Sequence, residues 1–353
     1  MDRILDYLRE QLAQWGMIAR GYAERAESRL VGAVCDATPR EILAAVGIVA
    51  LRVPLLDVEA CTGASHGNRI ADALRICEHV IVPRGCAAYG KISGSNSDRI
   101  VPFVVPHGYG EEAAIELHHS LDSLIKRLGR GGIDRLDPGR LALAVSEHDT
   151  VRRLTRGIAS VRHSRRNALS QSDLMLIFEA AAALPPDVII ESLAGILNAL
   201  NSLPPDGPVP PGRNILVRGG HITRLEALDD MERAGCVISE DDSCNGRRQF
   251  DVSHNHTSPG LYYEMLNALS YRPLCPSLRP PRERFDLFYR DLKNYAIETV
   301  VFLRDTMDEV MIAELESLRI RLMRTGVDPV IVDSVKAGSG LSAYLAATGT
   351  LSP

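Results

Sequence analysis

The amino-acid sequence predicts an α/β protein in which two parallel-sheet domains are joined by a helical segment. In the first and last thirds of the chain, short apolar runs alternate with amphipathic helical patterns, as in parallel sheets covered by helices. The middle third instead carries apolar residues at three- and four-residue intervals, which is typical of helices. The chain has 353 residues, of which 45% are apolar and 24% charged, and this suits a soluble globular protein of two or three domains.

The first part of the chain is predicted to form an N-terminal helix followed by a small α/β domain. Residues 1–30 begin with MDRILDYLREQLAQW, whose mixture of charged and apolar residues is typical of an amphipathic helix. Residues 31–110 are the first predicted α/β domain, because apolar runs of strand length occur there between helical patterns. The predicted strands are residues 48–54, 80–83 and 100–106.

A helix start is predicted early in this domain. Thr38 suits the N-cap position, and Pro39 suits the first helical position because no N–H donor is needed there. Glu41 would complete a capping box by bonding back to the N-cap. The helix that begins here would lead into the strand at residues 48–54.

The remainder of the chain divides into a helical segment and a second α/β domain. Residues 111–205 are the predicted helical segment, and the proline- and glycine-rich stretch LPPDGPVPPGRN (203–214) is the best candidate for a linker. Residues 206–353 are the second α/β domain, in which four apolar runs separated by helical patterns predict a parallel sheet. These predicted strands are residues 214–220, 236–242, 298–304 and 328–334.

Charge and hydropathy exclude several classes of partner. The formal net charge is -5, with acids and bases interspersed, so there is no electrostatic case for nucleic acid or an anionic membrane surface. No apolar run reaches the roughly 20 residues that a membrane span requires. The N-terminal sequence lacks the apolar segment of a signal peptide, so the cytosol is the expected location.

Ligands of open parallel sheets bind beyond the carboxyl ends of the strands, which gives five candidate positions. The turn at residues 218–221 suits either phosphate binding or a plain strand-to-helix connection. The loop at residues 240–248 suits either a ligand-facing site or a salt-bridged loop. The other three positions are residues 84–86, residues 304–305 and the stretch after Val332.

Cysteines are the residues with the clearest potential for metal or redox chemistry. Cys86 follows a predicted strand and a glycine, and Cys61 lies near a predicted helix N-terminus, where the helix dipole favours a thiolate. The pair suits either a metal cluster or two ordinary small buried residues. A zinc site is a further alternative, although its spacing matches no usual zinc motif. That site would use Cys236, Cys244, His254 and His256.

Five segments carry a resemblance to a known family. VGAVCDATPREILAAVGIVALRV (31–53) has a strand end, then a proline, a glutamate and a helix that leads into a second strand. Cys61 and VIVPRGCAAYGKI (80–92) provide paired cysteines around a strand. The other segments are residues 100–128, residues 235–250 and residues 274–305, the last with Cys275. In order and spacing, the five are similar to the D-component type subunits of 2-hydroxyacyl-CoA dehydratases and their relatives in benzoyl-CoA reductase.

This resemblance implies two flavodoxin-like parallel-sheet domains plus a helical segment. It also implies an acyl-CoA substrate, a homologous second subunit and a separate ATP-dependent activator protein that delivers a low-potential electron. The reaction would be a radical dehydration, which is lyase chemistry, or reduction of an aromatic acyl-CoA, which is oxidoreductase chemistry. The family holds a [4Fe-4S] cluster with three cysteines, and Cys61 and Cys86 match the first two.

The sequence departs from the family pattern at the third cluster position. The family has a cysteine at the end of the strand at residues 298–304, where this chain has Arg304, and an arginine cannot replace a thiolate. One hypothesis is a catalytic or electron-relaying subunit, with a third ligand from Cys275, another subunit or a non-cysteine group. It predicts that Cys61, Cys86 and Arg304 converge between the two α/β domains.

A second hypothesis is a cluster-free partner subunit that supplies structure and part of the acyl-CoA pocket, in line with the presence of Arg304. The third is an unrelated α/β protein that binds a nucleotide or a sugar, for which no convergence of cysteines is expected. Measurement of iron and sulfide in protein purified without oxygen would separate the first hypothesis from the other two.

Overall fold

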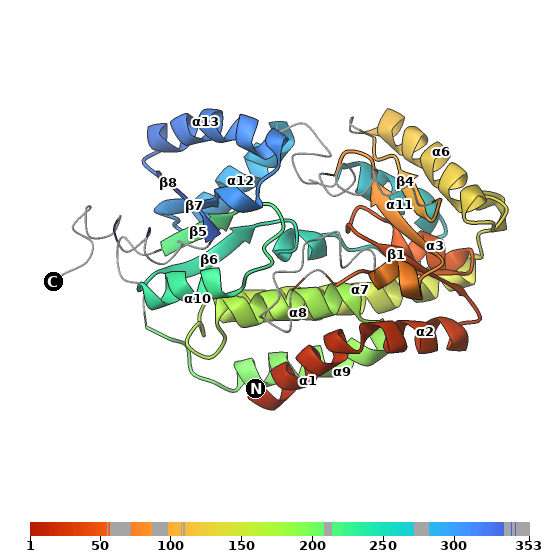
Figure 1. Ribbon diagram of the computed structural model, residues 1–353, viewed down its shortest axis with the longest axis horizontal. Helices are drawn as coiled ribbons and strands as arrows, with labels where there is room; N and C mark the ends of the chain where they lie inside the picture. The colour runs from red at the N-terminus through yellow and green to blue at the C-terminus, as the bar shows by residue number, and fades with distance from the viewer. Residues whose placement is uncertain are drawn as a thin grey trace. The chain divides into compact units, whose positions relative to one another are not determined.

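The chain forms two compact units, each with one four-stranded parallel sheet and covering helices, which confirms the predicted α/β class (Figure 1). Unit 1 comprises Met1–Thr155, Glu179–Ile196 and Phe250–Arg279, and unit 2 comprises Arg156–Phe178, Leu197–Gln249 and Pro280–Pro353. The computed structural model describes residues 1–54, 56, 72–86, 98–106, 108, 110–207, 214–271, 282–334, 340 and 343.

The sheet of unit 1 has the strand order β2-β1-β3-β4, with all neighbours parallel. From β1 the chain passes to β2 on one side and then to β3 on the other side, so the direction of strand addition reverses between β1 and β3. This is the order of flavodoxin-like sheets, and the reversal is the point at which such sheets bind ligands. The strands are β1 (Arg29–Ala33), β2 (Ile48–Arg52), β3 (His79–Pro83) and β4 (Ile100–Phe103).

Strand β1 was missed by the residue pattern, which predicts one helix through residue 30. Two helices, α1 (Asp2–Ala13) and α2 (Trp15–Arg25), are followed directly by β1. The strand RLVGA contains one β-branched residue and a glycine, so its intrinsic strand preference is weak. Its place in the centre of the sheet is set by packing, because a Cβ on Gly32 would lie only 3.0 Å from Val53.

The core of unit 1 lies between its sheet and a layer of helices. Figure 1 shows α6 and α11 beside β4, and the buried side chains Leu121 and Met265 come from these two helices. They pack with Ile81 and Phe103 from the strands, which gives one continuous apolar cluster. Beyond α2, the helices of unit 1 include α3 (Arg40–Ala45), α6 (Glu111–Arg127), the greater part of α7 (Pro138–Arg162) and α9 (Pro186–Asn201), and α11 (Leu261–Tyr271).

The capping box predicted at the start of α3 is wrong. Pro39 occupies the N-cap position, and within the described residues the Thr38 hydroxyl has no hydrogen-bond partner. The Glu41 carboxylate accepts a hydrogen bond from Arg152 of α7 at 2.5 Å instead. Burial alone would raise the pKa of Glu41, but the positive charge of Arg152 outweighs it and holds the pKa below its usual range. The Glu41 side chain therefore takes part in a buried ion pair within unit 1 instead of a capping box.

The histidine next to this ion pair predicts sensitivity to acid. Burial lowers the pKa of His148 from 6.5 to about 3, so this side chain stays neutral in the folded protein at pH values where the unfolded chain is protonated. As the pH falls from 6.5 towards 3, unfolding takes up a proton, and the free energy of unfolding decreases by up to about 1.4 kcal/mol per pH unit.

We therefore expect His148→Gln to reduce the loss of stability between pH 6.5 and pH 5 by about 1–2 kcal/mol. Urea unfolding at a series of pH values measures this, with His256→Gln at an exposed histidine of the same unit as the control. Parallel pH profiles for the parent and the His148 variant would show that this histidine is already protonated in the folded state.

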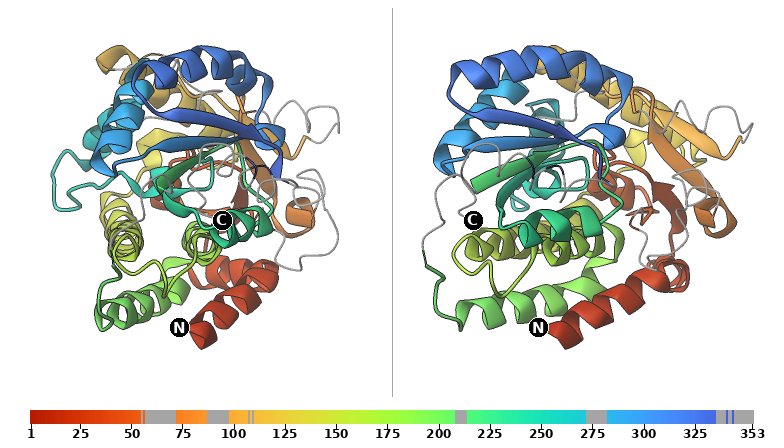
Figure 2. Two further views of the ribbon diagram at one scale, coloured as in Figure 1. Left: turned by 90° about the vertical axis from the view of Figure 1, so that its left-hand side faces the viewer. Right: turned by 60° about the vertical axis from the view of Figure 1, so that its left-hand side comes forward.

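Unit 2 repeats the strand order of unit 1, as β6-β5-β7-β8 with all neighbours parallel. Figure 2 shows α13 along one face of this sheet and α10 along the other. Phe302 of β7 packs with Phe288 of α12 and Leu318 of α13 in the core of the first of these faces. The strands are β5 (Asn214–Arg218), β6 (Val237–Asp242), β7 (Thr299–Leu303) and β8 (Asp328–Val332), and the helices are α10 (Glu226–Arg233), α12 (Arg282–Asn294) and α13 (Glu309–Arg324).

The segment predicted to be helical contains α6, α7, α8 (Gln171–Ala183) and α9, as expected. Of the linker predicted at residues 203–214, residues 208–213 lie outside the described part of the chain. Among the helices that the structure describes, none is both long and apolar enough to cross a membrane.

Candidate functional site

Two cysteines follow the two central strands of the sheet in unit 1. Cys35 comes after β1, and Cys86 comes after β3, which is hydrogen-bonded to β1. The pairing continues past the end of β1, because the Val34 N–H donates to the Ile81 carbonyl at 3.1 Å. The Cys86 N–H donates to the Pro83 carbonyl at 3.0 Å, which turns the chain directly after β3. Both cysteines are therefore at the carboxyl edge, where the strand order reverses.

The two side chains have similar surroundings. Each is partly buried, and each packs against the same apolar cluster of unit 1. The Cys35 thiol donates a hydrogen bond to the Asp36 carboxylate at 3.4 Å, and its sulfur accepts one from the Ala37 N–H at 3.4 Å.

Cys35 is a functional candidate that the sequence analysis missed. The signal that would have found it is the strand before it, because a cysteine directly after a central parallel strand belongs to the ligand-binding edge. Cys77 provides the contrast, since it precedes β3 and therefore lies at the amino end of that strand. Its side chain is buried, and burial raises the pKa of Cys77 to about 12, so it stays a neutral thiol.

Of the cluster residues predicted from sequence, Cys86 is the one that the structure describes. Cys61 and Cys275 lie outside the described residues. Cys86 belongs to unit 1 and Arg304 to unit 2, so their predicted convergence with Cys61 stays a prediction. In the described ranges, no group of three or more cysteine, histidine or acidic side chains is arranged to hold a metal ion.

The equivalent edge of unit 2 is closed by backbone packing. Here the turn after β5 contacts the turn after β7: the Gly220 N–H donates to the Thr306 hydroxyl at 3.0 Å. The Gly220 carbonyl accepts the Cys244 N–H at 2.9 Å. A phosphate-binding turn needs N–H groups that point at the ligand, and the Gly220 N–H is already used. Of the two alternatives for residues 218–221, these contacts support a plain strand-to-helix connection rather than a phosphate-binding turn.

The acidic loop after β6 is a network of salt bridges. Arg247 lies 3.0 Å from the Glu240 carboxylate, and Arg248 lies 2.5 Å from Asp242. Asp242 also pairs with Arg218, whose guanidinium is buried. Burial raises the pKa of Glu240 well above its usual value, although Arg247 acts in the opposite direction. Of the two alternatives for residues 240–248, the salt-bridged loop is the one that the contacts support.

The zinc alternative fails on the geometry of one strand. Cys236 immediately precedes β6 and Cys244 follows it. Strand β6 has six residues and is therefore about 20 Å long, because a strand rises about 3.3 Å per residue. Ligands of one zinc ion lie within about 4 Å of each other. The two cysteines therefore cannot share an ion.

Arg304, which stands where the cluster ligand was expected, is held by an ion pair. Its guanidinium donates hydrogen bonds to both carboxylate oxygens of Asp333 at 3.1 Å. The neighbouring Asp305 carboxylate accepts a hydrogen bond from the Ser334 N–H at 2.8 Å. These contacts join the turn after β7 to the end of β8 within unit 2, so Arg304 has a structural partner of its own.

A comparison with protein families gives one match that covers most of the chain. The family described as "2-hydroxyglutaryl-CoA dehydratase, D-component" matches residues 35–334. The matched region begins at Cys35 and ends at Ser334, and it therefore includes Cys86, Arg304 and strands β2 to β8. A search of curated proteins found no match.

Proposed function

The chain belongs to the 2-hydroxyglutaryl-CoA dehydratase, D-component family, and from this premise we propose that it is the cluster-bearing subunit of a 2-hydroxyacyl-CoA dehydratase-type complex. One observation carries the proposal beyond the family. Cys35 and Cys86 follow adjacent strands at the point in unit 1 where the strand order reverses. In flavodoxin-like sheets, this position is the usual one for a bound group.

The chemistry of these donors fits an iron–sulfur cluster. Thiolates are the protein ligands of [4Fe-4S] clusters, and cysteines Cys35 and Cys86 are partly exposed rather than sealed in the core. Cys61, predicted together with Cys86 as one of the first two ligands, comes from the connection between β2 and β3. These three cysteines would hold the cluster, and the bound cluster would relay one electron to the substrate. Cys275, another subunit or a non-cysteine group are the other sources of the third ligand.

The partners of the proposed complex are those that membership of the family implies. The substrate is an acyl-CoA, either a 2-hydroxyacyl-CoA that loses water or an aromatic acyl-CoA that is reduced. A homologous second subunit completes the complex. An ATP-dependent activator protein supplies the low-potential electron.

The alternative function is a cluster-free partner subunit of such a complex. The observation that favours it is the ion pair of Arg304 with Asp333, because a fixed guanidinium occupies the position of the family's third thiolate. Such a subunit would contribute structure and part of the acyl-CoA pocket without taking part in electron transfer.

Anaerobic purification with analysis of iron and sulfide tests the proposal against this alternative. The proposal predicts a brown protein with close to four iron and four sulfide per chain after reconstitution. It also predicts an electron paramagnetic resonance signal after reduction. A colourless protein that takes up no iron under these conditions would contradict the cluster-bearing function and support the cluster-free one.

Arg304→Cys is expected to increase the iron retained per chain during gel filtration, because it restores a thiolate at the position that the family uses. The Arg304–Asp333 pair is largely exposed, so its loss should cost only ~0–1 kcal/mol of stability. Arg304→Ser is the matched control, since it removes the same ion pair without adding a thiol. Equal iron retention in the two variants would show that this position is not near the cluster.

A further inference from the structure

Two arginine side chains of unit 1 converge on the turn between α3 and β2. The Nη1 atom of Arg140 lies 3.6 Å, and the Nη2 atom of Arg130 lies 3.8 Å, from the position that a Cβ atom on Gly47 would occupy. Gly47 directly precedes β2, so this turn is at the amino edge of the sheet. Cys35 and Cys86 follow strands at the carboxyl edge, so the two arginines belong to a different part of unit 1.

Backbone hydrogen bonds hold both arginines at this turn. The Arg130 N–H, just beyond the end of α6, donates to the Ile125 carbonyl at 3.3 Å, as in the Schellman motif that ends many helices. Arg140 is in the first turn of α7, and the Asp137 N–H just before that helix donates to the Ala45 carbonyl of α3 at 3.0 Å. The two side chains are therefore brought together by the fold itself, and a ligand would require little reordering of the backbone.

The two guanidinium groups have no partner in the part of the chain that the structure describes. Neither donates a hydrogen bond or forms an ion pair there, and the Arg130 Nε atom is buried as well as unpaired. A buried N–H without an acceptor costs free energy that a bound acceptor would recover. The acids of this region are bonded elsewhere, in the pairs Asp122–Lys126 and Glu78–Arg29 and in the contact of Asp137 with the Gly139 N–H.

The charge of Arg140 is at an unfavourable place in its helix. The positive end of the helix dipole is at the N-terminus, where acids stabilise and bases destabilise a helix. The first N–H groups of α7 do not offset this, because those of Gly139 and Arg140 donate to the Asp137 carboxylate at 2.8 Å and 3.1 Å. A bound anion would relieve both the repulsion between Arg130 and Arg140 and the unfavourable dipole, with the guanidinium groups as its hydrogen-bond donors.

We propose that Arg130 and Arg140 bind a phosphate group at the Gly47 turn, either as inorganic phosphate or as a phosphate ester of a small molecule. The planar fork of an arginine matches the spacing of phosphate oxygens, and each N–H···O bond would be about 2.7–2.9 Å long. A phosphate ester carries about two negative charges at pH 7, which equals the charge of the two arginines. A carboxylate carries one charge, and a single arginine fork would satisfy it.

This inference goes beyond the proposed function and does not rest on it. The site involves no thiol and no cluster, and it lies at the other end of the strands from Cys35 and Cys86. A protein without iron could therefore still bind phosphate here, and a protein that holds a cluster could fail to do so.

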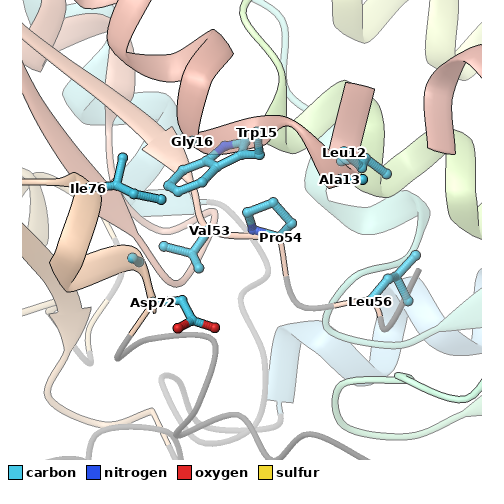
Figure 3. Close-up of a pocket in the computed structure, with 10 residues that line it drawn as sticks. Leu12, Ala13, Trp15, Gly16, Val53, Pro54, Leu56, Asp72 and Ile76 are labelled. Carbon is cyan, nitrogen blue, oxygen red and sulfur yellow. The ribbon is translucent and has the colours of Figure 1, made fainter. Parts of the chain in front are cut away.

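The pocket in unit 1 that Figure 3 shows is not suited to the same anion. Trp15, Val53 and Ile76 line it with apolar surface, and its volume is about 220 Å³. Its acid, Asp72, lies 2.9 Å from Arg75, which is outside the lining, and none of the described lining residues is basic. An anion in this pocket would meet apolar walls and a carboxylate, so the arginine pair is the better phosphate site.

Urea unfolding of the full-length chain tests the inference, in phosphate and in chloride at equal pH and ionic strength. A ligand that binds the folded state raises the unfolding midpoint. Phosphate also stabilises folded proteins in general, so the informative quantity is the difference between variants. We expect the gain with phosphate to be smaller in Arg130→Gln and Arg140→Gln than in the parent. Each variant should need about tenfold more phosphate for the same binding, because each loses charge-assisted hydrogen bonds.

Arg127→Gln is the matched control, since it removes the same charge from an exposed position of α6, close to Arg130 in the chain. Arg140 is exposed as well, so its replacement should leave the circular dichroism spectrum unchanged. The same gain with phosphate in the parent and in the Arg130 and Arg140 variants would overturn the inference. So would an equal reduction in Arg127→Gln, because the effect would then reflect net charge rather than a site.

A second measurement identifies the carrier of the phosphate. CoA and dephospho-CoA differ by one phosphate group, and isothermal titration compares their affinities for the same chain. A preference for CoA in the parent that disappears in Arg140→Gln would support the site with CoA as the carrier. If the phosphate-dependent gain is lost in Arg140→Gln but the parent binds both compounds equally, the site takes free phosphate or another ester.

Discussion

Gly220→Ala is expected to lower the free energy of unfolding by about 2–4 kcal/mol, which is a large effect for the addition of one methyl group. A Cβ built on Gly220 lies 2.0 Å from the backbone oxygen of Thr306. Backbone cannot move aside as a flexible side chain can, so the turns after β5 and β7 have to separate. Their separation would also weaken the hydrogen bond that Gly220 donates to the Thr306 hydroxyl.

Urea unfolding followed by far-ultraviolet circular dichroism measures this change, with Gly207→Ala as the matched control. No heavy atom of the described residues lies within 4 Å of a Cβ built on Gly207, so its replacement should change stability by less than about 0.5 kcal/mol. Hydrogen exchange shows where the structure is destabilised, since peptides from β5 and β7 should lose protection first. Unchanged exchange in both strands would mean that the two turns are not packed as described.

The strands of unit 2 could be predicted from sequence because each satisfies a local rule. β5 and β7 are buried at every position and consist mainly of apolar residues, and this pattern is visible without knowledge of the fold. The repeated strand order is different. It depends on which side of the first strand each crossover passes, and the residue pattern within a strand carries little information on that choice.

The failures of prediction share one physical cause, which is that contacts between distant residues overrode local preference. The capping box at Thr38 was lost because Arg152, more than a hundred residues away, binds Glu41. β1 has a weak local preference and exists because β2 and β3 pair with it on both sides. Cys35 was missed as a consequence, since a site defined by the end of a strand cannot be found without the strand.

The position of Cys86, by contrast, was predictable. A buried apolar run followed by a glycine and a cysteine places the thiol at the carboxyl edge of a parallel sheet by chain geometry alone. What the residue pattern could not provide is its neighbour on β1. The second member of the candidate site, Cys35, follows the strand that pairs with β3, although residues 36–85 of the chain lie between the two cysteines.

Cys86→Ser is expected to abolish the iron content and colour of the anaerobic protein, and Cys35→Ser is expected to reduce the iron content to less than half that of the parent. A serine hydroxyl stays protonated at neutral pH and is a poor ligand for iron, whereas a cubane that loses one of three thiolates becomes labile. The smaller effect at Cys35 follows from its competition with Cys275 or another subunit as the third ligand. Iron and sulfide analysis, together with the visible absorption spectrum, measures both effects.

Cys77→Ala is the control for these variants. It removes a thiol from the same unit, but that thiol is buried and its raised pKa of about 12 keeps it protonated, so iron content should not change. Circular dichroism spectra that match the parent would show that each variant is folded. If Cys35→Ser retains as much iron as Cys77→Ala while Cys86→Ser loses it, Cys35 is not a ligand of the cluster. If all three variants and the parent lack iron, the reversal point between β1 and β3 has no cluster, and the cluster-free partner function replaces the redox role.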